Sequence, residues 1–407
     1  MRMKNLLAFC IAGLSCLVLT AHAHEYQTQH QAQHQASSLA VSVAFDAAGN
    51  LWRASTKGDF VQVDLSSDLG KSFSKPITIN PHPQKIASGG EARPKIAIGP
   101  EGNIYLTWTE ALKTPFSGYI WFARSTNGGK TFEKPIIVHQ DRAEITHRFD
   151  ALNVAQFGDT KGNITVLWVD KRDLIAAKAA NKPYAGAAIY YAVSTNKGAS
   201  FNTEQKLADS SCECCRIVTA NKPDGTVAAM WRHVFEGSER DHMIAEVPAK
   251  ANQIPVMKRA TFGHWKIDGC PHQGAAIATG GEGKDWWGYH MAYFDGNDAK
   301  PGLYYSRMDG VAWASSPPKK FGNNKNQAGH PAILSMGEKV WLVWRETEAK
   351  NNTIIGMFSD DGGRSWQDAK VLASTTDKAD YPQLLAKDNQ AYLVWNTLKE
   401  GFRLQGL

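Results

Sequence analysis

The sequence predicts an all-β protein, built as a β-propeller of six or seven four-stranded antiparallel blades. Three observations predict it: a turn pattern that occurs four times, a strand pattern that ends in tryptophan and occurs five times, and a composition rich in turn-forming and aromatic residues. Regular repeats are typical of folds that build one small sheet again and again. The 35 Gly, 17 Pro and 13 Trp of the 407 residues suit such a chain.

The turn pattern has eight residues and reads Ser-x-(Asp/Asn)-x-Gly-x-(Ser/Thr)-(Phe/Trp). Its copies are 66–73, 125–132, 194–201 and 359–366, and 306–313 is a decayed copy. The Asp or Asn side chain can accept hydrogen bonds from its own backbone, and the Gly permits a positive φ, so each copy predicts a tight turn. We expect the closing aromatic ring to pack between neighbouring sheets.

The second pattern is a turn followed by an alternating strand that ends in tryptophan, as in 102–108 and 162–168; later copies end at Trp231, Trp344 and Trp395. Each such strand follows a short apolar strand, of which there are seven: 41–45, 94–98, 151–155, 217–220, 275–278, 331–334 and 382–385. One unit is therefore an inner strand, the tryptophan strand and the two strands beside the eight-residue turn. A ring of such sheets buries faces that one sheet leaves exposed. The last unit stops after about three strands, and a segment from the N-terminus is a candidate for the fourth.

The eight-residue pattern resembles the Asp-box, or BNR repeat, of the sialidase superfamily. The resemblance covers residues 38–407 and implies a sialidase-like propeller with its ligand at the mouth of the central channel. Such a repeat marks a fold and leaves the activity open.

The first 23 residues predict a secretory signal peptide, with Arg2 and Lys4 before an apolar run and a small-x-small site at 21–23. We expect cleavage near Ala23 and export to the periplasm or the medium. A flexible leader rich in His and Gln follows over 24–37, and the propeller occupies 38–407. No later segment is apolar enough to predict membrane insertion, and a net charge of +6 without a Lys/Arg block gives no reason to expect nucleic acid.

The channel mouth should carry the loops that enter the inner strands and those that follow the tryptophan strands. Sialidases use a tyrosine nucleophile, a carboxylic acid and arginines that hold the substrate carboxylate. The resemblance therefore implies Tyr381 as nucleophile and Glu110 or Asp170 as acid, with four candidate ligand-binding arginines: Arg93, Arg148, Arg216 and Arg345. The family's early Arg-Ile-Pro motif is absent, and the alternative is that these arginines form ordinary salt bridges with acids of the loops.

The chain beyond the signal peptide has four cysteines, Cys212, Cys214, Cys215 and Cys270. In an exported protein two disulfides are the first expectation, and a bridge from the loop of Cys212 to Cys270 is one pairing. The alternative is a site for copper or zinc, since thiolate and imidazole suit Cu(I) and Zn(II). The imidazoles considered for it are His272, His147 and His330.

Three functions follow from these residues. The first is binding of a glycan or another small-molecule ligand at the channel mouth, with exo-glycosidase activity of the sialidase type. The second is metal binding or redox chemistry at the Cys/His cluster. The third is a non-catalytic scaffold that binds a ligand or a protein partner.

Overall fold

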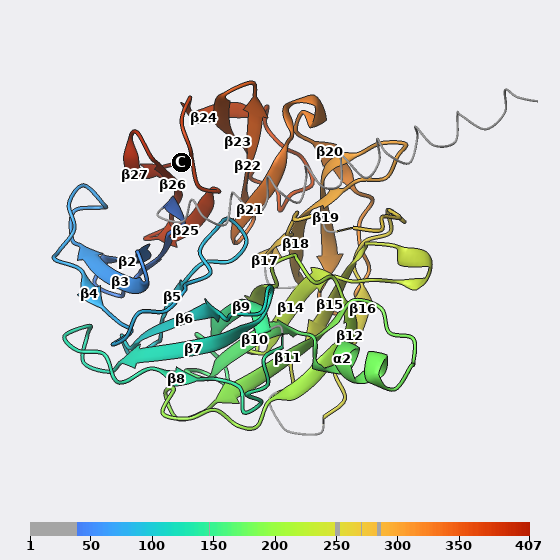
Figure 1. Cartoon of the computed structure of the whole chain (residues 1–407). Coiled ribbons are helices and arrows are strands. Elements are labelled where there is room, and N and C mark those ends of the chain that lie inside the picture. The colour runs from blue at the N-terminus through green and yellow to red at the C-terminus, as the bar shows by residue number, and fades with distance from the viewer. Residues whose placement is uncertain (1–38, 146, 249–252, 270, 283–285) are drawn as a thin grey trace, which may run out of the picture.

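The structure is a computed structural model that describes residues 39–145, 147–248, 253–269, 271–282 and 286–407. Seven separate antiparallel sheets stand around a central channel, and the chain visits them in order (Figure 1). The inner strands of successive sheets contact each other all the way round, and the first also contacts the last. The predicted propeller is thus confirmed, and the number of blades is seven. The predicted signal peptide and leader lie outside the described residues.

Each sheet pairs its strands in chain order. The first three sheets are β1 (Ser42–Phe45), β2 (Leu51–Lys57), β3 (Phe60–Ser66) and β4 (Ile77–Thr78); β5 (Lys95–Ile98), β6 (Ile104–Ala111), β7 (Gly118–Ser125) and β8 (Ile136–Ile137); and β9 (His147–Val154), β10 (Ile164–Asp170), β11 (Ala187–Ser194) and β12 (Gln205–Ser211). The next two are β13 (Val218–Asn221), β14 (Val227–Arg232), β15 (His242–Glu246) and β16 (Met257–Arg259); and β17 (Ala276–Glu282), β18 (Trp286–Asp295), β19 (Gly302–Asp309) and β20 (Lys319–Phe321). The last two are β21 (Gly329–Met336), β22 (Lys339–Glu348), β23 (Asn351–Ser359) and β24 (Lys370–Thr375); and β25 (Gln383–Lys387), β26 (Gln390–Thr397) and β27 (Gly401–Gly406).

The helices of the described residues lie in loops between strands. They are α2 (Arg172–Ala179) and the short 3-10 helices η2 (Glu236–Ser238) and η3 (Asn324–Asn326). Within the described ranges, none of these helices is long and apolar enough to cross a membrane.

The tryptophan strands supply the core between the blades. Trp108, Trp168, Trp231, Trp344 and Trp395 are each at most 2% exposed. Their neighbours come from two successive sheets: Trp168 on β10, for example, shares a cluster with Ile120 and Phe122 of β7. The large indoles therefore fill the space between sheets, as the repeated strand pattern predicts.

The four eight-residue turns, here called the box turns, have the same hydrogen bonds. In the first, the Ser66 hydroxyl donates to the Asp68 carboxylate at 2.7 Å and accepts from the Gly70 N–H at 2.7 Å, while the Ser72 N–H donates to Asp68 at 2.9 Å. The other three copies repeat this set. Gly70 has φ +80°, and a Cβ there would meet the ring of Phe402 at 2.7 Å, so glycine is needed on both counts. The predicted tight turns are present.

The closing aromatic rings of the box turns pack against the preceding blade. Phe73 meets Phe402 edge-on at 5.2 Å, Phe201 meets Phe122 at 4.9 Å, and Trp366 meets Tyr305 at 4.7 Å between ring centroids. The expected position between sheets is confirmed.

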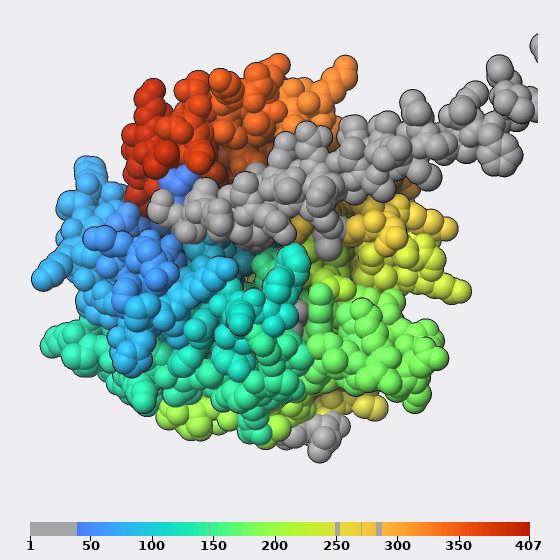
Figure 2. All heavy atoms as spheres, in the orientation of Figure 1, coloured from blue at the N-terminus to red at the C-terminus, as the bar shows by residue number. Residues whose placement is uncertain are grey.

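The seventh sheet has three strands in the described part of the chain, and the expected fourth strand from the N-terminus falls on residues outside it. Side chains join this sheet to the first two sheets. Arg93, just before β5, forms a bidentate ion pair with Asp380, just before β25, at 2.6 and 2.8 Å. Both residues also form hydrogen bonds with the backbone of Val41, beside β1. Arg93 donates to the Val41 carbonyl at 2.9 Å, and the Val41 N–H donates to the Asp380 carboxylate at 3.2 Å. We call Val41, Arg93 and Asp380 the closing clasp. Figure 2 shows the first sheet (blue) beside the last (red).

Candidate binding site at the channel mouth

The channel holds a charged cavity at one end and an uncharged cavity at the other. The charged one has a volume of about 320 Å³ and is lined by Glu91, Arg93, Lys95, Arg216 and Tyr381 together with apolar inner-strand residues. The other, of about 500 Å³, lies at the turns that end the inner strands and has no charged lining residue. Loops that enter inner strands supply the charged end, which is the rim where the sequence predicts the site.

Glu91 is the centre of a buried polar cluster in this cavity. Its carboxylate accepts a hydrogen bond from His330 Nδ1 at 2.9 Å and one from the Arg216 N–H at 3.3 Å, and it lies 3.5 Å from the Arg216 guanidinium. Burial by itself raises the pKa of Glu91, but the Arg216 charge and the His330 hydrogen bond outweigh it and lower that pKa to about 2. Glu91 is therefore a carboxylate at every physiological pH.

His330 is neutral in this cluster, since burial lowers its pKa to about 4 in spite of Glu91. A carboxylate only accepts hydrogen bonds, so Nδ1 carries the proton of His330 and Nε2 carries a lone pair. The imidazole thus has the form of a base rather than a cation.

Tyr381 stacks on His330, with ring centroids 3.5 Å apart and planes within 10°. The ring fits because residue 90 is glycine: a Cβ there would lie 1.7 Å from Tyr381 Cε2. Burial raises the pKa of Tyr381 to about 12, although the nearby Arg345 charge works in the opposite direction. The phenol is therefore protonated at neutral pH.

Arg345 differs from the other arginines of the site. Its guanidinium carbon lies 4.8 Å from the centre of the Tyr381 ring, and its Nε is buried with no hydrogen-bond partner. Among the described residues no carboxylate lies within 4.0 Å of it, whereas Arg93 is taken up by the closing clasp and Arg216 by Glu91 and by the Ala275 and Pro331 carbonyls. Arg345 is thus a cation beside Tyr381, which lines the cavity, and it has capacity for an anionic ligand.

Arg148, the fourth predicted arginine, does not line the cavity, and neither does Arg345. The Arg148 guanidinium lies over Phe149 at 4.8 Å and Phe116 at 5.4 Å. Lys95, which the sequence reasoning missed, does line the cavity and lies 3.2 Å from Asp150. Its position two residues after Arg93 on an inner strand could have indicated this, because alternate residues of a strand share a face.

The two acids predicted for catalysis contact other partners. Glu110 accepts a hydrogen bond from the Trp121 indole at 2.7 Å. Asp170 is fully buried and accepts from the Trp168 indole at 3.0 Å and from Arg172 at 2.7 Å. Neither lines the cavity that contains Tyr381, whose acidic lining residue is Glu91.

Two of the histidines predicted for the Cys/His cluster, His147 and His330, contact other residues. His147 is buried, stacks on His139 at 3.8 Å and lies 3.4 Å from Asp170, while His330 belongs to the Glu91 cluster. His272 precedes β17 with φ +49°. Cys270 lies outside the described residues, and with it the bridge suggested for the loop of Cys212.

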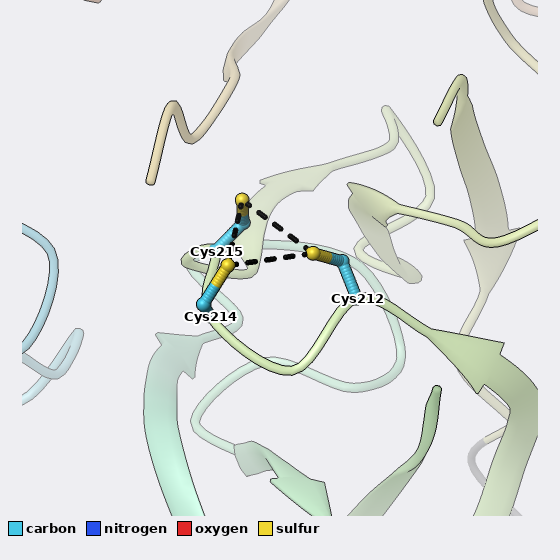
Figure 3. Close-up of side chains that lie close together, drawn as sticks. All are labelled: Cys212, Cys214 and Cys215. Atoms are coloured by element: carbon cyan, nitrogen blue, oxygen red, sulfur yellow. Dashed lines mark hydrogen bonds between the residues drawn. The ribbon is translucent and has the colours of Figure 1, made fainter. Parts of the chain in front are cut away.

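Cys212, Cys214 and Cys215 converge on one point in the loop between β12 and β13 (Figure 3). Their sulfur atoms are 3.5 to 4.0 Å apart. A disulfide needs about 2.05 Å, so these three sulfurs are not bonded to one another. Arg216, which follows directly, links this loop to the cavity.

No family model and no curated protein matches the sequence. Solved structures do match in shape. A polysaccharide lyase, an ulvan lyase bound to a GlcA(1-4)Rha3S saccharide, has a TM-score of 0.53 at 9% identity over 91% of this chain and 94% of that chain. A Hadza microbial sialidase has a TM-score of 0.49 at 12% identity over 86% and 74%, and a protein of unknown function from Dyadobacter fermentans has 0.49 at 15% over 79% and 94%.

The chain is therefore a seven-bladed β-propeller similar in fold to propellers that act on glycans. At these identities the likeness concerns the fold, and the activity has to be argued from the residues of the cavity.

Proposed function

We propose that the protein binds an acidic saccharide at the charged end of its channel. The observation that supports this most directly is Arg345, a cation beside the cavity residue Tyr381 with no carboxylate partner in the described chain. A carboxylate or sulfate on a sugar would supply the missing anion and form charge-assisted hydrogen bonds with it. The lyase with the similar fold was solved with a saccharide that contains GlcA and Rha3S, which is consistent with this ligand class.

The cavity also holds groups that can move a proton. For hydrolysis of the sialidase type, Tyr381 would be the nucleophile, and Glu91 is better placed than Glu110 or Asp170 to be its carboxylate, because both line one cavity.

A second reaction, elimination next to a sugar carboxylate, is favoured by the protonation states. His330 Nε2 carries a lone pair, the stacked Tyr381 phenol is protonated, and Arg345 is available to neutralise the sugar carboxylate. A base, an acid and a cation for the carboxylate are the groups that abstraction of a proton beside a carboxylate requires.

Binding is tested by calorimetry with a panel of saccharides that carry a carboxylate, a sulfate or no charge. Arg345→Met should weaken binding of the acidic members by about 10- to 100-fold, the loss expected for one charged hydrogen bond. The matched control is Arg124→Met, since Arg124 bonds to a box turn through the Lys197 carbonyl at the other rim. Equal affinity for neutral and acidic saccharides, or equal losses in both variants, would refute the proposal.

Turnover is tested separately with a fluorogenic sialoside and with a uronic acid polysaccharide, whose elimination product is followed by its ultraviolet absorbance. Under hydrolysis, Tyr381→Phe removes the nucleophile and sialoside turnover stops. Under elimination, His330→Gln abolishes formation of the unsaturated product while binding persists. Binding of a saccharide without formation of either product would mean that the protein is a glycan-binding module.

A further inference from the structure

The loop between β12 and β13 carries three cysteines whose sulfur atoms form a small triangle. The edges are 3.5 Å from Cys212 to Cys214, 4.0 Å from Cys214 to Cys215 and 4.0 Å from Cys215 to Cys212. All three residues are buried, with at most 5% of their surface exposed. In Figure 3 the three side chains point toward one another from a single turn of the chain.

A triangle of this size fits sulfur atoms that share one metal ion. A metal–thiolate bond of about 2.3 Å places the sulfurs about 3.8 Å apart in tetrahedral geometry and about 4.0 Å apart in trigonal geometry. Soft thiolate ligands select ions such as Cu(I) and Zn(II), and structural zinc takes four protein ligands. Three thiolates complete the coordination of Cu(I), whereas structural zinc takes a fourth ligand, so Cu(I) is the ion that these three cysteines can hold by themselves.

A buried arginine beside the triangle provides an independent observation. Arg232 is 2% exposed, and its guanidinium donates only to the carbonyls of Arg240, Gln273 and Phe294, at 2.6 to 3.0 Å. In the part of the chain that the structure describes, no carboxylate lies within ion-pair distance of Arg232. The Arg232 charge acts on the Asp295 carboxyl from beyond ion-pair distance, and three thiolates around Cu(I), with a net charge of −2, would add to the negative charge that a buried cation requires.

The loop is held in place before any ion binds. The Cys212 N–H donates to the Arg232 carbonyl at 2.8 Å, Glu213 forms an ion pair with Lys171, and the Arg216 guanidinium donates to the Ala275 carbonyl at 3.0 Å. A ligand set fixed by its surroundings loses little entropy on binding.

We propose that Cys212, Cys214 and Cys215 form a trigonal thiolate site for one Cu(I) ion. Binding makes three Cu–S bonds and releases the three thiol protons to solvent, with no change of oxidation state. A thiol becomes a metal ligand when the ion displaces its proton.

The other cluster of potential donors is Glu239, Asp241 and His264. Its charges are already matched: Arg259 pairs with both acids, and Asp241 also accepts from the Thr261 hydroxyl and the N–H groups of Gly263 and His264. This cluster therefore serves as the control.

The test is an anaerobic titration of the reduced full chain with Cu(I) against a chromophoric Cu(I) chelator. We expect one Cu(I) per chain, released protons in the ratio of three to one, and no binding in the triple variant Cys212→Ser, Cys214→Ser, Cys215→Ser. His264→Gln should bind as the unaltered protein does. Melting curves identify any variant that fails to fold.

X-ray absorption of the loaded unaltered protein gives an answer that needs no variant, and we expect three sulfur neighbours at about 2.3 Å. Four ligands around zinc, or full Cu(I) binding in the triple variant, would overturn the proposal. So would an intact mass showing these cysteines as disulfides in protein recovered from the exporting cell.

Discussion

The closing clasp predicts how the ring fails when one partner of the ion pair is removed. Asp380→Ala deletes the carboxylate that holds both Arg93 and the Val41 N–H, and leaves the buried Arg93 with two carbonyl partners. Removing one partner of a buried ion pair costs about 3–5 kcal/mol. With an unfolding entropy of about 2.1 cal/mol/K per residue over about 370 residues, this corresponds to a drop in Tm of about 4–6 °C.

The double variant Arg93→Met, Asp380→Ala should be more stable than Asp380→Ala. Burial raises the pKa of Asp380 even though Arg93 is adjacent, which means that desolvation exceeds the attraction within the pair. The Arg93–Asp380 ion pair as a whole therefore adds little to the free energy of unfolding. Most of the loss in Asp380→Ala comes from the buried Arg93 charge that no longer has a carboxylate partner.

The assay is thermal unfolding at neutral pH, with hydrogen exchange read on β1 and β25. We expect faster exchange in those two strands in Asp380→Ala and a partial return in the double variant. If the double variant loses as much as the sum of the two single variants, the account of an orphaned charge is wrong.

Three further predictions concern packing and protonation. Gly90→Ala puts a Cβ into the Tyr381 ring, so we expect a loss of about 1–3 kcal/mol in unfolding free energy by denaturant and weaker saccharide binding by calorimetry; unchanged values would disprove the close approach. Ser359→Ala leaves the buried Gly363 N–H without its 2.8 Å partner and should cost about 1–3 kcal/mol in the same denaturant assay, whereas the exposed Ser365→Ala should cost less. His290, like His330, has its pKa lowered by burial from 6.5 to about 4, so its contribution is complete above pH 6.5 and is lost as the pH falls through 4. Unfolding free energy measured from pH 7 to 4 should fall by up to about 1.4 kcal/mol per pH unit for each such histidine, and a slope that His290→Asn leaves unchanged would contradict this.

Local patterns were enough to predict the fold. The box turns depend on contacts within a few residues, and the tryptophan strands have an alternation that is visible within one short segment. Both occur in the structure with the geometry that their residues require. The number of blades stayed open between six and seven, because the last unit has about three strands in the sequence and the described ion pair that joins it to the second sheet follows no repeated pattern.

The site could be predicted only in part. Arg93, Arg216 and Tyr381 were expected at one rim because they occupy equivalent loops, and they line one cavity. Their partners could not be predicted, since the contact of Arg93 with Asp380 spans 287 residues. The hydrogen bond from the Trp168 indole to Asp170 could have been predicted, because Trp168 lies two residues earlier on the same face of the strand.

The order of strands also bears on how the chain is made. Every sheet in the described part of the protein consists of strands that follow one another along the chain. A blade can therefore complete its hydrogen bonds as soon as its own segment has left the ribosome, and loop closure over long distances is left to the final contact between β1 and β25. Synthesis thus supplies the blades one at a time. In a circular permutant with its new ends between any two blades, each sheet would still be formed by one continuous segment of the chain.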